Sequence, residues 1–295
     1  MKCSWITKVN VVVLSLWVMM TLGNGQKFKA TQEITERLKK AYAYYCQGQY
    51  EQALNSALPI YQKDPDIWVA WWPKWVYRVV KGPIPDPYQK SEIMRLTVKS
   101  YEEGRSLNLS AYRKTANARQ LVADSYFALG RFQEALPIYE EIEQLFGKGP
   151  ALLPGKSRMC RRYIAQGYRP PQPPPKNTWR PLPLRFREED YFILVPLEEA
   201  CKVLGLGCSI APNTKVAGGK GIRVTKPDAP NITWRLFLGH PIVERLENGK
   251  GHTEGIAYAP FEEDGKVWVP FYWLARQAGI RGWEVRNGKI YVAPK

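Results

Sequence analysis

Apolar residues recur at helical spacing through the first half of the chain, from about residue 31 to residue 167. They lie three or four positions apart, break at a short turn that contains glycine, and resume after it, as expected for amphipathic helices. In the first hairpin the apolar positions are Ile34, Leu38, Ala41 and Tyr45, then Ala53, Leu54, Ala57 and Tyr61 after the turn Gly48-Gln49-Tyr50. The second hairpin runs from Leu121 to Phe146, with Gly130-Arg131-Phe132 at its turn. The pattern predicts two antiparallel helical hairpins.

The two hairpins can be aligned on their turn glycines, and their key positions then coincide. Matching Gly48 to Gly130 superposes an aromatic on each side of the glycine and an alanine beyond it. The aligned pairs are Tyr44 with Tyr126, Tyr50 with Phe132, and Ala53 with Ala135; Pro65 ends the first unit and Gly147 the second. This pattern resembles the tetratricopeptide repeat family, in which small residues let paired helices approach closely. Two units are few for a stable array, so irregular helices in 66–120 and a last helix near 156–166 are expected to complete it.

From Glu188 onward the pattern changes to short strands, and one segment occurs twice. The segment Tyr191 to Gly205 is repeated, with substitutions, as Gly265 to Gly279 at a constant offset of 74 residues. Each copy predicts a strand that ends in Val-Pro, a short helix with glycine just past its end, and a further strand. Near the C-terminus, Asn287-Gly288 between two short alternating runs is a strong hairpin signal. The last 110 or so residues are therefore expected to be a duplicated α+β unit.

This second half resembles the copper amine oxidase N-terminal-like domain, also called a stalk domain. The resemblance is carried by the turn Asp264-Gly265, the strand Val267 to Pro270, the helix Phe271 to Ala278, Gly279, and the hairpin Trp283 to Val292. A weaker copy lies at 190–225. The resemblance implies a small module of exported bacterial proteins that is attached to other domains. It does not imply oxidase chemistry, because a copper site of three histidines cannot be built from the two in this chain, His240 and His252.

A proline-rich stretch, 168–187, separates the helical pattern from the strand pattern. Pro170 to Pro175 holds five prolines, and Pro181 and Pro183 follow. Such a stretch cannot form a helix or an inner strand and favours an extended linker. The expected fold is therefore multidomain. An all-α helical-repeat domain (26–167) is followed by the linker (168–187) and by an α+β stalk-type domain of two strand–helix half-repeats (188–295).

The N-terminus has the features of a secretory signal peptide. Met1 to Lys8 is basic, Val9 to Leu22 is a 14-residue apolar core, and Gly23 and Gly25 fit the small residues before a cleavage point. We expect residues 1–25 to be removed, with an uncleaved anchor as the alternative. Nothing later in the chain is apolar enough to span a bilayer, so the mature protein is expected to be secreted or held in the cell envelope.

The charge of the chain is strongly basic, and one stretch concentrates it. The formal net charge is +16, and 156–187 contains no acidic residue. An anionic cell-wall polymer, phospholipid head groups or nucleic acid could pair with it, although an exported protein seldom meets nucleic acid. A solvated linker is the plain alternative. The candidate contacts are Lys156, Arg158, Arg161, Arg162, Arg169, Lys176, Arg180, Arg185 and Arg187.

Four tryptophans form the other candidate binding feature. Trp68, Trp71, Trp72 and Trp75 lie at i, i+3, i+4 and i+7, which on a helix is one face. Such a face could stack sugar rings, and it could equally be core between helical pairs. Pro73 disfavours helical geometry at the residue before it, Trp72. If the helix begins at Pro73, the four tryptophans do not share one helical face.

Cysteines and polar residues give little sign of chemistry. Cys3 would leave with the signal, and of the other four, Cys201 and Cys208 flank a chain reversal where a disulfide could form, two buried thiols being the alternative. The cysteines lack the paired Cys-x-x-Cys spacing of a zinc site, which argues against one. We find no motif of a serine, cysteine or metal-dependent hydrolase, and expect no catalytic residue, metal or cofactor.

Taken together, these features predict an exported, non-enzymatic binding or scaffolding protein of the bacterial cell envelope. The helical repeats would hold a protein or peptide, and the stalk-type domain would engage peptidoglycan, another anionic wall polymer or a partner. The main alternative is an accessory protein for glycan processing that binds carbohydrate through the stripe Trp68 to Trp75. An enzyme assembled from dispersed carboxylates is a third. The sequence names neither the ligand nor the oligomeric state.

Overall fold

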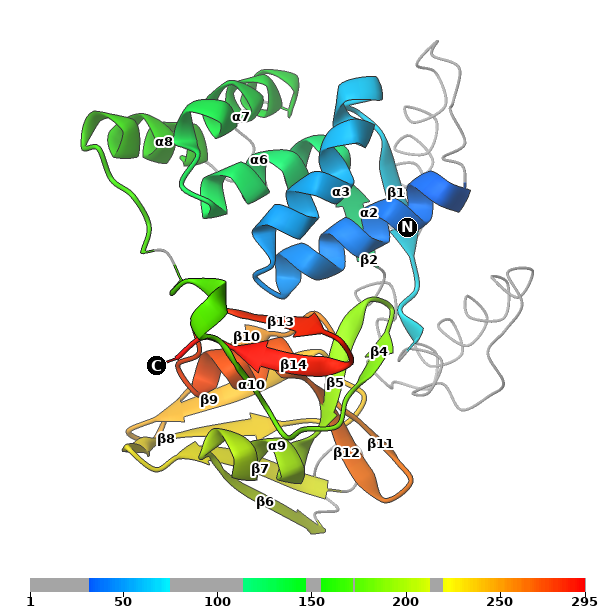
Figure 1. Ribbon diagram of the computed structural model, residues 1–295, viewed down its shortest axis with the longest axis vertical. Coiled ribbons are helices and arrows are strands. Elements are labelled where there is room, and N and C mark those ends of the chain that lie inside the picture. The colour runs from blue at the N-terminus through cyan, green and yellow to red at the C-terminus, as the bar shows by residue number, and fades with distance from the viewer. Residues whose placement is uncertain (1–31, 75–113, 147–154, 172, 213–219, 295) are drawn as a thin grey trace, which may run out of the picture.

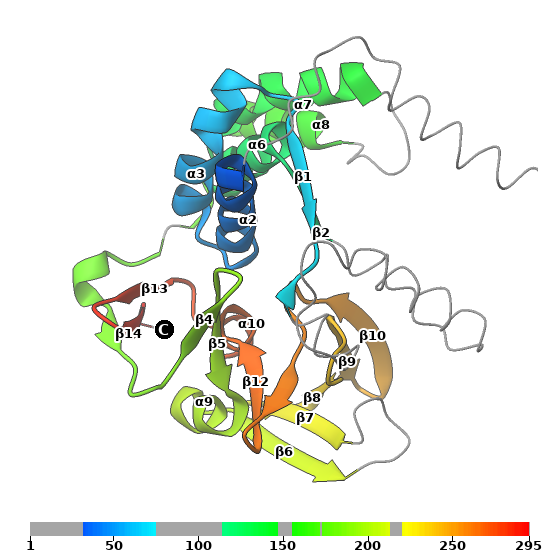
Figure 2. The same ribbon diagram turned by 90° about the vertical axis from the view of Figure 1, so that its right-hand side faces the viewer.

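The computed structural model describes residues 32–74, 114–146, 155–171, 173–212 and 220–294. Within these ranges the chain forms α-helices and antiparallel sheets. A helical half, built from the first part of the chain, lies against an α+β half built from the last part (Figures 1 and 2). None of the helices in the described ranges is long and apolar enough to cross a bilayer. The predicted signal segment, 1–25, lies outside them.

In the described part of the helical half, five helices pack in a row in chain order (Figure 1). They are α2 (Gln32–Cys46), α3 (Tyr50–Lys63), α6 (Ala118–Ala128), α7 (Phe132–Phe146) and α8 (Lys156–Ala165). Both predicted hairpins form, and their turn glycines share one left-handed conformation, with φ of 76° at Gly48 and 75° at Gly130. Alanines where the helices meet, Ala41, Ala53, Ala123 and Ala135, are completely buried, as close helix packing requires.

The second hairpin stacks directly on the first, although some 50 residues separate them. The expectation of irregular helices throughout 66–120 is wrong at both ends, where β1 (Trp68–Trp71) and β2 (Lys114–Asn117) form an antiparallel pair. Because the two strands are antiparallel, the end of β2 lies beside the start of β1, and the Ala118 amide donates to the Ile67 carbonyl (3.1 Å). The Asn117 side chain then caps α6 by accepting from the Gln120 amide (3.0 Å). The rest of that insertion, 75–113, lies outside the described residues.

The α+β half is built on two strand–turn–strand–helix units, which we call the first copy and the second copy. The first copy is β4 (Arg187–Glu189), β5 (Phe192–Pro196) and α9 (Leu197–Leu204); the second is β11 (Phe261–Glu263), β12 (Lys266–Pro270) and α10 (Phe271–Gln277). β5 and β12 pair antiparallel at the centre of a four-stranded sheet, with Val195 directly opposite Val269. Pro196 and Pro270 occupy equivalent positions before their helices, with φ, ψ of −63°, 124° and −67°, 125°.

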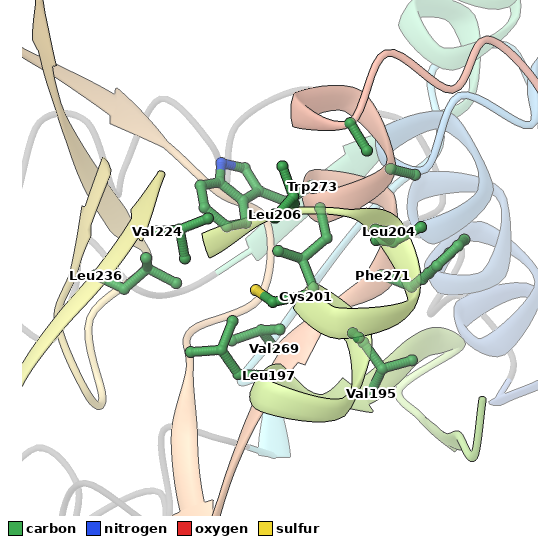
Figure 3. Packing of buried hydrophobic residues seen from close by; sticks show 14 of the residues in the cluster. Val195, Leu197, Cys201, Leu204, Leu206, Val224, Leu236, Val269, Phe271 and Trp273 are labelled. Atoms are coloured by element: carbon green, nitrogen blue, oxygen red, sulfur yellow. The ribbon is translucent and has the colours of Figure 1, made fainter. Parts of the chain in front are cut away.

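Both copies contribute to one core. Figure 3 shows side chains of the first copy, Val195 and Leu197, in the same cluster as Val269 and Phe271 of the second. All four are at most 1% exposed. Apolar burial is the dominant favourable term in folding, so the two copies stabilise each other rather than folding as separate modules.

Each copy continues into further antiparallel strands. After the first come β6 (Gly207–Pro212), β7 (Lys220–Lys226), β8 (Ala229–Leu236), β9 (Ile242–Glu247) and β10 (Lys250–Gly255), which form a five-stranded antiparallel sheet. After the second come β13 (Trp283–Arg286) and β14 (Lys289–Val292). Asn287 and Gly288 connect them with φ of 48° and 68°, the two-residue turn that the sequence predicted.

The proline-rich stretch is not a free spacer over its whole length, which differs from the linker expected over 168–187. Its second half forms a short 3-10 turn (Lys176–Thr178) and β3 (Arg180–Pro181), which pairs with β14 as the edge strand of a three-stranded sheet. Trp179 and Leu184 are buried. Proline is tolerated at a sheet edge, where its missing N–H faces away from the neighbouring strand, so composition alone did not exclude this role.

A separate apolar cluster joins the two halves. It combines Ala43 of α2 with Phe192 and Leu194 of β5, together with Tyr258 and Phe261. At its margin the turn between β4 and β5 meets the end of α2, as Figure 2 shows. The two halves therefore share buried surface, and a cavity lies beside this contact.

Candidate functional site

A cavity of about 480 Å³ lies between the two halves. Its size is in the range of small-ligand and peptide sites, which commonly lie where domains meet. Three stretches far apart in the sequence form its walls. They are the turn between α2 and α3 with the end of α6, the proline-rich stretch from Pro170 to Trp179, and α10 with the segment that follows it as far as Glu284.

The helical wall is held in place by one buried glutamine. The Gln47 side chain donates to the Tyr191 carbonyl (2.9 Å) and the Ala43 carbonyl (3.1 Å), and it accepts from the Ile193 amide (3.1 Å). The two partners are two residues apart, Tyr191 in the turn before β5 and Ile193 on β5, so the glutamine offers them what a neighbouring strand would offer. Because Gln47 is only 4% exposed, these groups would otherwise be buried without partners. The turn that lines the cavity is therefore fixed to β5.

The proline-rich wall is a strap packed against both halves. On the helical side, a Cβ on Gly130 would come within 2.3 Å of the Pro170 ring. On the other side, a Cβ on Gly282 would lie 2.9 Å from Trp179 and 3.0 Å from Pro173. The Trp179 indole donates to the Pro174 carbonyl at 2.8 Å. The strap approaches both halves so closely that only glycine fits at these two positions without rearrangement.

The third wall supplies most of the charge. Arg276 is paired with Glu254 (2.6 Å), and Lys176 on the strap reaches Glu284 (2.5 Å). Arg281 is exposed at the rim. With Glu51 on the helical wall, the cavity combines three cations and two carboxylates with aromatic, amide and proline surface.

One cysteine lines the cavity, and its environment makes it unreactive. Burial raises the pKa of the Cys46 thiol to about 11. The thiolate is the nucleophilic form, so a thiol that stays protonated at neutral pH is a poor nucleophile. In the ranges that the structure describes, no group of three or more metal-ligating side chains comes together. The geometry is suited to holding a ligand by shape and hydrogen bonds.

The predicted tryptophan stripe does not form. Trp68 and Trp71 lie in a strand, where residues three apart point to opposite faces. Trp68 is 54% exposed, whereas Trp71 packs edge-on against Tyr42, with ring centres 5.4 Å apart. Trp72 packs at the margin of the cluster that joins the halves, and Trp75 lies outside the described residues. The helical spacing was misleading because β1 is completed by β2, a partner more than 40 residues away.

The structure divides the nine basic candidates into two groups. Five are paired with carboxylates, and four have no ion pair with any residue in the described ranges. The pairs are Lys156 with Asp124 (2.5 Å), Arg161 with Glu140 (2.6 Å), Lys176 with Glu284, Arg185 with Glu199 (2.8 Å), and Arg187 with Glu263. The unpaired four are Arg158, Arg162, Arg169 and Arg180, all exposed. Within the described ranges, this second group is the one that no carboxylate neutralises.

Cys201 and Cys208 are adjacent but are not bridged. Both are free thiols, and the hydrogen bond that Cys201 donates to Cys208, together with burial, raises the pKa of Cys201. Cys46 and Cys160 are free as well. The alternative of unbridged thiols therefore describes this structure.

Sequence reasoning missed the cavity because no local pattern marks it. Tyr50 and Trp283 belong to segments that were assigned only structural roles, and Trp179 was placed in a linker. The one available signal was Trp179 itself, since a large aromatic residue is unusual in a solvated spacer.

Comparison with family models, with curated proteins and with solved structures found no match for this chain.

Proposed function

We propose that this chain is an exported, non-enzymatic binding protein of the bacterial cell envelope, which holds a peptide segment of a partner in the cavity between its two halves. The observation that carries the proposal is the cavity's construction. Its walls come from three distant segments, and each wall is fixed by buried contacts, Gln47 to β5 and Pro170 to Gly130 among them. A preformed site loses less conformational freedom when a ligand binds.

A peptide suits the lining better than a small rigid ligand does. Gln49 and Gln52 offer amides that can pair with a peptide backbone, and Tyr50, Trp179 and the strap prolines offer flat apolar surface. Arg281 at the rim can pair with an acidic side chain of the partner. The observed tryptophan positions give no comparable support to a sugar platform at Trp68 to Trp75.

The same proposal assigns the two halves to families. The matched turns at Gly48 and Gly130, and the direct stacking of α6 on α3, support a tetratricopeptide-like domain over 26–167. The paired copies around Val195 and Val269 support a stalk-type domain over 188–295. In this assignment the α+β half attaches the protein to wall material or to a second protein. Sedimentation with purified peptidoglycan tests the first of these, and a protein that stays in the supernatant would count against it.

Filling the cavity tests its role directly. Ala128 is half-buried and lines the cavity, so Ala128→Trp should occupy it. Ala211→Trp, on an exposed position of β6, is the matched control. Peptides selected from a random display library on the unmodified protein should bind the control equally and Ala128→Trp at least about tenfold more weakly, a loss of about 1.4 kcal/mol.

Two results would contradict the proposal. One is a library that yields no binder. The other is a set of binders that Ala128→Trp retains with unchanged affinity, while its thermal midpoint shows that the variant is folded. A second filling variant, Gln52→Trp on α3 of the same wall, guards against a rearrangement peculiar to position 128.

A further inference from the structure

Helix α8 is the last helix of the helical row, and its outer face is uncovered by any described element. It packs on α7 through Ser157 and Cys160, which are 3% and 0% exposed, and the Ser157 hydroxyl donates to Glu143 at 2.6 Å. Figure 1 shows α8 at the end of the row, away from α2. The opposite side of the helix therefore faces outward.

That outer face carries unpaired positive charge. Arg158 and Arg162 lie one turn apart, and Arg169 follows just after the helix ends. All three are exposed, and none has an ion pair with a residue in the described part of the chain. Their neighbours Lys156 and Arg161, by contrast, reach Asp124 and Glu140. Within the described ranges, the cations of α8 nearest α6 and α7 are paired with carboxylates, and those on the outer face are not.

This arrangement disfavours the helix that carries it. Like charges four residues apart repel each other, and a basic first turn opposes the helix dipole. α8 has no acidic residue in its first turn, and although Arg162 in its last turn suits the helix dipole, Arg162 still repels Arg158. No carboxylate in the described ranges pairs with the outer arginines, so an external anion is the partner that their arrangement suits.

Exposed apolar side chains accompany these arginines. Five large hydrophobic residues in the described ranges are clearly exposed, and three of them belong to this end of the helical half: Leu145 (57%), Met159 (38%) and Tyr168 (45%). Met159 lies on α8 itself, between Arg158 and Arg162. A soluble polyanion would gain nothing from a methionine, whereas a lipid surface takes up both cations and apolar side chains.

We propose that the outer face of α8, with Arg158, Met159, Arg162 and Arg169, docks the protein onto a membrane surface that contains anionic phospholipid. The arginines pair with phosphate groups, and Met159 enters the boundary between head groups and acyl chains. This contact is separate from the interdomain cavity, so either could fail without the other.

Vesicle binding tests the proposal. Vesicles of phosphatidylglycerol and phosphatidylcholine are compared with vesicles of phosphatidylcholine alone, by co-sedimentation. The measurement uses the full chain and a chain that begins at Gln26, in which the apolar segment 9–22 cannot contribute. Binding should require the anionic lipid and weaken as salt is raised. Replacing Arg158, Arg162 and Arg169 by Gln together should lower the partition coefficient about a hundredfold, and each single replacement should lower it about fivefold.

Matched variants separate this site from net charge. Lys202, Arg223 and Lys289 are exposed on the α+β half, and their joint replacement by Gln removes the same charge. That control should retain most of the binding. Met159→Gln should weaken vesicle binding while leaving any binding to soluble polyphosphate unchanged.

Three outcomes would overturn the proposal. They are no preference for anionic vesicles, equal losses in the α8 variant and the control, or retention on purified wall polymer without binding to vesicles. If the triple variant fails to show the far-ultraviolet circular dichroism of the folded protein, the single replacements decide the question.

Discussion

The two copies of the strand–helix unit share a backbone but differ in what surrounds them. Both turn between their first two strands through a pair of residues with positive φ: 48° and 66° at Asp190 and Tyr191, 52° and 70° at Asp264 and Gly265. Glycine adopts this conformation readily, whereas a tyrosine there is a rare, strained residue. In the second copy the turn faces open space. In the first copy it contacts the helical half.

Those contacts explain why a strained residue persists at this turn. The Tyr191 carbonyl accepts from Gln47, its hydroxyl donates to Glu36 (2.9 Å), and Asp190 accepts from the Lys74 amide (2.6 Å). Strained backbone is retained where surrounding structure over-determines it. The comparison teaches that duplication supplied one scaffold twice, and that the first copy became the docking point for the helical half.

The largest expected effect tests what the copies share. Leu197 and Phe271 are equivalent and are 1% and 0% exposed. Leu197→Ala should lower the free energy of unfolding by about 2–5 kcal/mol and Phe271→Ala by about 3–5 kcal/mol, because each removes atoms from one common core. Denaturant unfolding measures both, with the exposed Lys202→Ala as control. A loss below about 1 kcal/mol for either would mean that its copy lies outside the core.

The next effect tests what the copies do not share. Gln47→Ala leaves the Tyr191 carbonyl and the Ile193 amide without their partner. Each such buried group costs about 1–3 kcal/mol, so the variant should lose about 2 kcal/mol or more. Gln49→Ala, in the same turn, is the control. Equal stability of the two variants would show that the docking bonds contribute nothing.

Single substitutions in the positive-φ turns of the two copies should change stability less. Gly265→Ala should cost about 1 kcal/mol, because the second copy offers no contacts to offset a left-handed alanine. Tyr191→Gly relieves comparable strain but loses the hydroxyl bond to Glu36, so its net effect should be close to zero. Thermal unfolding of both variants checks this. A large stabilisation by Tyr191→Gly would mean that the contacts to the helical half do not offset the strain.

The smallest effect depends on pH. Burial raises the pKa of Asp190 above its ordinary value of 3.8. The folded protein therefore holds this proton more tightly than the unfolded chain does, and the contribution of Asp190 to stability falls as pH rises from about 3.8 through the folded pKa. As pH rises through that window, the thermal midpoint of the unmodified protein should fall relative to that of Asp190→Asn, which cannot ionise at this position. A difference in thermal midpoint that stays constant with pH would refute the assignment.

The parts of this fold that the sequence predicted are those encoded locally. The Val-Pro strand ends, the glycines after each short helix and the Asn287-Gly288 turn depend on the conformational limits of single residues, so they can be predicted without knowing their partners. The constant offset of 74 also predicted equivalent surroundings for Pro196 and Pro270.

The parts that were missed depend on partners far away in the chain. Trp68 and Trp71 have helical spacing but form a strand, because Lys114 to Asn117 pairs with them. Pro181 suggested a free linker but forms a sheet edge, because β14 is left open beside it. The cavity needed three segments to be brought together, and no periodicity in any one of them indicates the other two.

The central claim is that the helical half and the α+β half form one cooperative body, joined through the first copy. Differential scanning calorimetry of the full chain and of Gln47→Ala tests it most directly. The account predicts one transition for the unmodified protein, with calorimetric and van't Hoff enthalpies equal, and two separated transitions for the variant. Two independent transitions in the unmodified protein would contradict it.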